Sequence, residues 1–160
     1  MRLRDSLVLG AGLLAGFVHS STYANEEIVM SHATTNFEVT FTPQEPDNAP
    51  ARAAGLQRVA IEKQFKGDLV GTSNAEMLTS GDAARSGAYV AIEKFTGKLH
   101  GRSGSFVLVH RALMNRGVPE GWSVEIVPDS GTGELQGIRG QLTIRIEGDQ
   151  HFYEIEYSLP

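Results

Sequence analysis

The chain has 160 residues, of which 41% are hydrophobic, and its 19 acidic and 14 basic residues leave a formal charge of −5. This length fits one domain, and this composition excludes a disordered chain. The negative charge argues against a nucleic-acid or anionic-membrane partner, because either would require a basic face. The absence of cysteine excludes disulfides, thiolate catalysis and Cys-ligated zinc or iron–sulfur sites.

The N-terminus has the layout of a secretory signal peptide. Met1–Arg4 is a short basic start, and the apolar run Leu7–Val18 follows it after two polar residues. This run is shorter than the ~20 residues that span a bilayer, and Thr22–Ala24 supplies small residues for cleavage. We therefore expect a signal peptide over residues 1–24 and one mature domain over residues 25–160. The mature protein would be periplasmic or secreted, without stable membrane insertion.

Alternation of apolar and polar side chains predicts the strands of the mature chain. In the first of them, Phe37, Val39 and Phe41 share one face. Three prolines between residues 43 and 55 then predict a long surface loop. No convincing helix is expected after the signal segment. The expected strands are Asn36–Thr42, Gln57–Lys66, Asp68–Leu78, Ala88–Thr96, Ser105–Leu113, Trp122–Val127, Gln141–Ile146 and His151–Leu159.

Eight short strands at regular spacing predict an all-β fold. The connections are too short for helical crossovers, so the strands should pair antiparallel, with a hairpin turn at residues 147–150. A closed barrel is favoured because closure leaves no exposed sheet edge. We expect an eight-stranded antiparallel closed β-barrel, with a β-sandwich as the alternative.

Three segments share a Gly-x-Leu-x-Gly pattern, namely Gly67–Gly71, Gly97–Gly101 and Gly133–Gly137. Each follows one expected strand and leads into another. Glycine permits positive φ at such corners, and the single leucine can pack under the bend. The glycine spacing and the strand–helix setting of a nucleotide-binding loop are absent, so these turns are interpreted as structural.

The segment Tyr89–His110 resembles the signature of the domain of unknown function 3224 family, a group of small, mostly bacterial proteins. Lys63–Leu69, Val127–Leu135 and Glu156–Leu159 also match that family, and the resemblance spans residues 37–159. Members of the family are placed with the allene oxide cyclase-like barrels. The resemblance therefore implies an eight-stranded barrel with a central pocket and no established reaction. A cyclase-type cysteine role cannot be carried over.

Three polar side chains are predicted to line this pocket. Glu93 alternates in step with Tyr89, and its burial would raise its pKa unless it is paired. Lys63 and His110 also fall in step with apolar residues of their strands, and Lys63 could be the partner of Glu93. An ion pair on the outer surface, or an inner pair that serves only packing, is the alternative. A lone histidine on an apolar face is also often a core residue.

Four further residues are weaker candidates. Glu76 lies on a strand whose inward face cannot be read from its small and polar neighbours. Tyr89, Tyr153 and Tyr157 could line an apolar cavity with their hydroxyl groups, although core packing explains them equally well. The histidines show no metal-ligand spacing, and no cofactor is expected.

These features favour a barrel that binds a small, largely apolar molecule through Lys63, Glu93 and His110. One alternative is an isomerase or cyclase for a lipid-like or terpenoid substrate, with Glu93 as the acid or base. Another is a non-catalytic module that assembles into a homo-oligomer. A binding barrel would need an interior cavity of about 300 Å³ or more.

Overall fold

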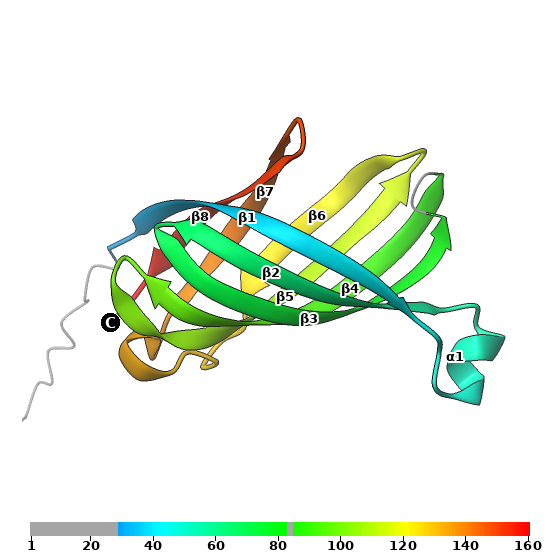
Figure 1. Ribbon diagram of the computed structural model, residues 1–160, viewed down its shortest axis with the longest axis horizontal. Helices are drawn as coiled ribbons and strands as arrows, with labels where there is room; N and C mark the ends of the chain where they lie inside the picture. The colour runs from blue at the N-terminus through cyan, green and yellow to red at the C-terminus, as the bar shows by residue number, and fades with distance from the viewer. Residues whose placement is uncertain (1–28, 83–84) are drawn as a thin grey trace, which may run out of the picture.

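The computed structural model describes residues 29–82 and 85–160, so the expected signal peptide lies outside the described residues. Within these residues, eight strands form a closed antiparallel barrel in which β8 returns to pair with β1 (Figure 1). The predicted barrel is confirmed, and the β-sandwich alternative is excluded. The strands are β1 (Ser31–Gln44), β2 (Gln57–Gly67), β3 (Leu69–Asp82), β4 (Ser86–Leu99), β5 (Arg102–Asn115), β6 (Val118–Ile126), β7 (Arg139–Glu147) and β8 (Gln150–Ser158).

The observed strands are longer than the apolar alternation predicts. β1 begins at Ser31 and β6 at Val118, each before its predicted start. Ser80, predicted to begin a loop, continues β3 and pairs with Ala88 of β4. Ladder hydrogen bonds join backbone groups whatever the side chains are, so pairing continues where the alternation has ended.

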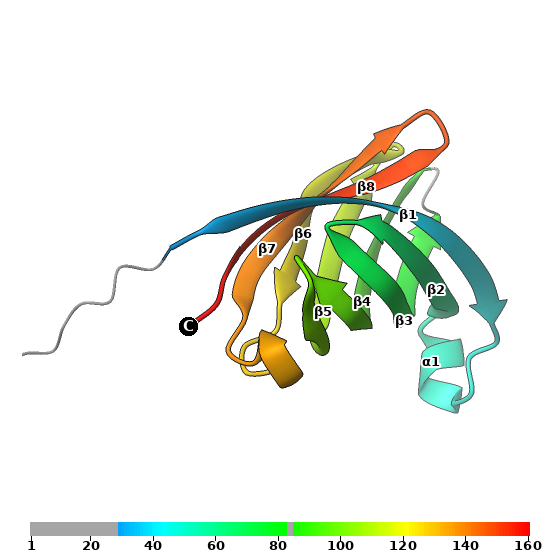
Figure 2. The same ribbon diagram turned by 60° about the vertical axis from the view of Figure 1, so that its left-hand side comes forward.

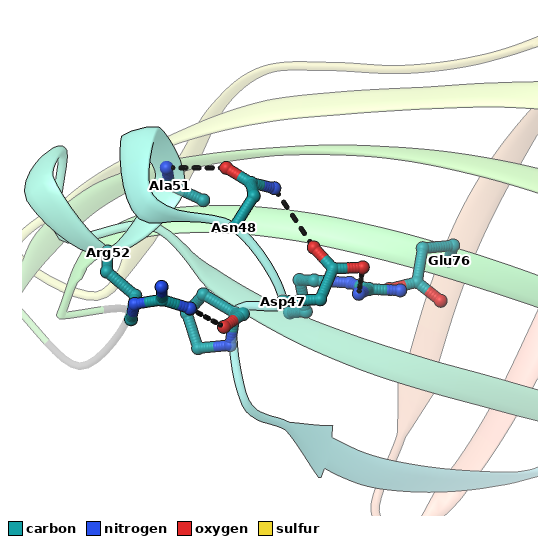
Figure 3. Close-up of polar contacts among 7 residues, drawn as sticks. Asp47, Asn48, Ala51, Arg52 and Glu76 are labelled. Atoms are coloured by element: carbon teal, nitrogen blue, oxygen red, sulfur yellow. Dashed lines mark hydrogen bonds and ion pairs between the residues drawn. The ribbon is translucent and has the colours of Figure 1, made fainter.

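The prediction of no helix after the signal segment is wrong at two short places. α1 (Ala49–Ala53) lies in the proline-rich loop, and the 3₁₀ turn η1 (Gly133–Leu135) lies between β6 and β7. Asn48 caps α1, because its side-chain oxygen accepts a hydrogen bond from the backbone N–H of Ala51 at 2.8 Å (Figure 3). Neither of these helices, nor any other in the described part of the chain, is long and apolar enough to cross a membrane.

The Gly-x-Leu-x-Gly turns close one end of the barrel. Leu69, Leu99 and Leu135, one from each repeat, are fully buried, as the sequence predicts. Burial of each such side chain contributes roughly 1.5–3 kcal/mol to folding. Gly71 and Gly97 face each other across β3 and β4, where the two backbones approach too closely for a side chain. We call this the closed end.

The opposite end of the barrel is open to solvent. Phe41, Trp122 and Ile146 occupy inward-facing positions of their strands, yet 56%, 37% and 55% of their surfaces are exposed. β6 and β7 pair only through Val124 and Glu125, and the ladder of β1 with β8 stops at Phe37. The tip of the β7–β8 hairpin therefore has no partner strand on either side, and it projects from the barrel (Figure 2). We call this the open end.

Candidate functional site

A group of five polar side chains lies inside the barrel, and we call it the charged cluster. Glu93 of β4 is fully buried at its centre. Its Oε2 accepts a hydrogen bond from Lys63 Nζ at 2.5 Å and one from the Tyr153 hydroxyl at 3.3 Å, while Oε1 accepts one from Ser73 at 2.6 Å. His110 Nε2 lies 2.8 Å from Oε2. That distance is within the range of an ion pair, but the angle at His110 Nε2 does not meet the geometry of a regular hydrogen bond.

The cluster holds Glu93 in its ionised form. Burial alone raises the pKa of this carboxyl group, because a low-dielectric interior disfavours the charge. The imidazole of His110 and the ammonium group of Lys63 outweigh that effect, and together they lower the pKa of Glu93 from 4.5 to about 2. Glu93 is therefore a carboxylate acceptor at neutral pH.

The pKa values of Lys63 and Tyr153, the two neighbours of this carboxylate discussed next, are shifted mainly by burial. Burial lowers the pKa of Lys63, although the charge and hydrogen bond of Glu93 oppose the change. Burial and the negative charge of Glu93 raise the pKa of Tyr153, which therefore keeps its proton. Lys63 Nζ donates to the Tyr153 hydroxyl at 2.5 Å and lies 4.9 Å from the centre of that ring. The tyrosine thus contacts the ammonium group through its hydroxyl oxygen.

The two sides of the cluster differ. Toward the closed end, aromatic rings fill the barrel, with the Phe37 and Tyr153 ring centres 4.6 Å apart. Toward the open end, the inward positions of β3, β4 and β5 carry the small residues Ala75, Ala91 and Ala112. Beyond them stand the partly exposed apolar side chains of the open end. The charged cluster therefore lies buried between the aromatic side chains of the closed end and the partly exposed apolar side chains of the open end.

Two hollows follow the seams beside the β7–β8 hairpin. One, of about 340 Å³, lies where β1 and β8 part, and its inward-facing lining is Phe37, Val39 and His151. The other, of about 60 Å³, lies where β6 and β7 part and includes Trp122 and Ile144. A third hollow of about 510 Å³ lies beside the C-terminus. None of these three is lined by a member of the charged cluster.

The structure brings together the three leading residues predicted from sequence. Lys63, Glu93 and His110 all face inward, and they lie in direct contact. Tyr89 faces inward at the open end, where burial raises its pKa and a hydrogen bond from Trp122 partly opposes the shift. Tyr157 faces inward at the closed end, where its hydroxyl lies 2.8 Å from His100 Nδ1. In the described part of the chain, no group of three possible metal-ligating residues occurs.

The structure corrects the inclusion of Glu76 among the inward candidates. Its side chain lies on the outer face and is 46% exposed. Arg58 binds Glu76 and Asp47, each at 2.7 Å. Asp47 lies in the loop that carries α1 (Figure 3). On this stretch of β3, Ser73 and Ala75 face inward instead. The outward side chains of this strand satisfy their charges at the surface, so Glu76 takes no part in the cluster.

Sequence reasoning missed Ser73 and undervalued Tyr153. Ser73 sits in a strand of small residues, where alternation has no contrast to reveal the inward face. Its cross-strand pairing with Lys63 would have identified it, but that register comes only with the structure. Tyr153 shows clear alternation, and only the distances assign it to Glu93 instead of to core packing.

These observations define the class of this protein: a small antiparallel barrel with one closed end, one open end and a buried charged cluster. The chain belongs to the DUF3224 family, described as "Protein of unknown function", whose profile matches residues 33–157. It is similar to a crystal structure of a DUF3224 protein of unknown function from Shewanella oneidensis MR-1. The identity is 42%, the TM-score is 0.74, and the match covers 82% of this chain and 99% of that chain. No curated protein matches the chain.

Proposed function

We propose that this protein binds a small, largely apolar molecule in the open end of its barrel. One observation carries the proposal, namely a buried charged cluster beneath inward-facing apolar side chains that are exposed to solvent. Binding sites for small molecules commonly combine apolar walls with a few convergent polar groups. The allene oxide cyclase-like relationship, implied by sequence resemblance, agrees with such a pocket.

Inward-facing side chains at the open end would form the walls of the binding site. Ala75, Ala91 and Ala112 face inward next to the cluster, alongside the longer side chains of Ile61, Met77 and Tyr89. Phe41 of β1 and Trp122 of β6 would contact the ligand at the entrance, and both would lose exposed surface on binding. Lys63 and His110 would meet its polar end.

Trp122 provides a test, because it is the single tryptophan of the chain and lies at this entrance. A small apolar probe should shift its fluorescence emission to the blue as water leaves the indole ring. Native mass spectrometry of purified protein should also detect a co-purified small molecule. An emission spectrum unmoved by apolar probes, together with a ligand-free mass, would contradict the proposal.

A matched pair of variants locates the binding. Ala91→Leu places a larger side chain on the inward face above the cluster and should weaken probe binding. Val90→Leu enlarges the neighbouring side chain on the outer face, where half of the residue is exposed. It should leave binding unchanged. Equal loss in both variants would place the probe elsewhere.

We also propose that the protein is exported, on the basis of residues 1–24. The mature chain isolated from a periplasmic or extracellular fraction should begin at Asn25. N-terminal sequencing of that fraction tests this directly. An intact Met1 on the folded protein in every cell fraction would contradict export.

The catalytic alternative is an isomerase or cyclase for a lipid-like or terpenoid substrate. A general acid must hold its proton at the working pH, so the low pKa of Glu93 disfavours that role for it. As a base, the carboxylate is already occupied by three hydrogen bonds. Binding is therefore the function that the site supports better.

A homo-oligomer is supported by a separate observation on the outer face. Leu78, Val90 and Ile92 lie outside β3 and β4, and they are 39%, 52% and 55% exposed. Neighbouring exposed apolar side chains of this kind occur at protein interfaces. Native mass spectrometry of a Val90→Lys/Ile92→Lys variant should then show more monomer than the unchanged protein. An unchanged protein that is monomeric would contradict this alternative.

A further inference from the structure

Lys63 differs from every other lysine of the chain in where its amine lies. The chain has four lysines, and Lys66, Lys94 and Lys98 all project from the outer face. Lys63 projects into the barrel, where 7% of the residue is exposed. The binding proposal uses Lys63 only as a polar contact. A buried amine beside an apolar entrance has a further chemical capacity, because desolvation favours its neutral, nucleophilic form.

Nζ is held by two hydrogen bonds, and an imine would keep one of them, because the iminium nitrogen carries a single N–H. An ammonium group has three N–H donors, and Lys63 uses two of them to bind Glu93 and Tyr153. Glu93 keeps only 1% of its side-chain surface exposed, whereas Lys63 keeps 8%. Of the two charged side chains, Lys63 is therefore the less completely buried. The lowered pKa of Lys63 agrees with a reactive amine.

Charge balance selects the class of ligand. The ammonium group of Lys63 and the carboxylate of Glu93 neutralise each other inside the barrel, and breaking such a buried pair is costly. An anionic ligand would add a second negative charge beside Glu93. A neutral carbonyl compound that condenses with Lys63 would keep one positive charge on Nζ, and the ion pair would persist.

We infer that Lys63 forms a reversible imine with an apolar aldehyde or ketone that enters through the open end. A carbon–nitrogen bond forms between the carbonyl carbon and Nζ, and the carbon–oxygen double bond breaks. Two protons of the ammonium group leave with the carbonyl oxygen as water, and the third remains on the iminium nitrogen. No oxidant or reductant takes part. Tyr153 and Glu93, both in contact with Nζ, hold the nitrogen in place during the exchange.

This inference rests on the proposed function, so the experiment measures binding and bond formation separately. Octanal and 1-octanol have the same chain, and only octanal can condense with an amine. Each is added to the purified full chain, and Trp122 emission reports binding. Borohydride is then added to reduce any imine to a stable secondary amine, and peptide mass mapping locates the octyl group.

We expect both compounds to shift Trp122 emission and octanal alone to modify the protein. The octyl group should lie on Lys63, in large excess over Lys66, Lys94 and Lys98. Unfolding in urea before octanal is added should remove this preference, because all four amines are then in water. Excess 1-octanol should reduce labelling of Lys63 in the folded protein and leave the outer lysines unchanged.

Two outcomes would overturn the inference in different ways. If both compounds shift Trp122 emission and Lys63 is labelled no more than Lys66, binding stands and the imine does not form. If neither compound shifts the emission, the proposed function fails and the inference fails with it. Lys63→Met leaves Glu93 unpaired and could unfold the barrel, so mapping in the unchanged chain is the deciding measurement. Lys66→Met is the matched control, and in this variant octanal and borohydride should label Lys63 as in the unchanged protein.

Discussion

At the scale of single residues, the charged cluster is the unusual feature of this barrel. Glu93 is a fully buried carboxylate, and every hydrogen bond that it accepts comes from an inward-facing side chain of another strand. A buried ion pair adds little net stability, because desolvation offsets the attraction between the charges. Removing one partner is different, since it leaves the other charge buried and unpaired. The cluster is therefore better explained by specificity or function than by a gain in stability.

Glu93→Gln tests this description. The change leaves the Lys63 charge without a counter-ion in the interior, so we expect the free energy of unfolding to fall by about 3–5 kcal/mol. Urea unfolding followed by circular dichroism measures the loss. Glu76→Gln, which removes an exposed carboxylate from the outer face, should have a small effect. A comparable loss in both variants would contradict the special position of Glu93.

The low pKa of Glu93 also predicts a pH dependence. Its folded pKa of about 2 lies below the ordinary value of 4.5, so the unfolded state binds more protons between these values. The resulting stability is complete above about pH 4.5 and is lost as the pH falls toward 2. Urea midpoints across this range should fall steeply for the unchanged protein and less steeply for Glu93→Gln. Exposed carboxylates with lowered pKa values, such as Glu38 and Asp47, would supply the remaining slope. If the urea midpoints of both proteins fell equally steeply with pH, the low pKa of Glu93 would be contradicted.

At the scale of elements, the contact between β3 and β4 depends on two glycines. A Cβ on Gly71 would lie 2.3 Å from the carbonyl oxygen of Thr96, and one on Gly97 would lie 2.1 Å from that of Val70. Each distance is far inside van der Waals contact. The repeated turns thus need glycine mainly to let neighbouring backbones meet above the buried leucines.

Gly71→Ala should therefore destabilise the barrel more than an alanine at an uncrowded glycine. Gly148 in the β7–β8 turn has φ +59° and open space around it, so Gly148→Ala should cost only the roughly 1–2 kcal/mol of the left-handed conformation. Crowding at Gly71 should add about 1–3 kcal/mol. Urea unfolding of the two variants gives the comparison, and equal losses would contradict the role of crowding.

At the scale of the whole molecule, the barrel is uneven along its length. Ladders are continuous around the closed end, whereas β6 and β7 pair through only two residues and β1 leaves β8 after Phe37. The outer half of the β7–β8 hairpin is bound only to itself. It therefore stands between two seams that lead into the open end.

Hydrogen exchange should reveal this unevenness. Amides of residues 143–150 that point away from the hairpin have no partner strand, so they should exchange with little protection. Amides of Ile92 and Lys94, in the fully paired middle of β4, should exchange much more slowly. NMR-detected exchange compares the two sets. Strong protection of the hairpin tip would indicate a further partner strand in solution.

The sequence by itself determined the order of the strands and, where alternation is clear, which side chains share a face. Alternation with a period of two is a local property of the chain, so it put Lys63, Glu93 and His110 in step with apolar residues of their strands, and the structure shows that these faces point inward. Only the tertiary structure decided which inward residues meet, because register and strand stagger set the distances between strands. It thereby joined Ser73 and Tyr153 to Glu93, and it moved Glu76 to the outside. The open end was also invisible in sequence, because Phe41 and Trp122 alternate as core residues do and only the parting of neighbouring strands exposes them.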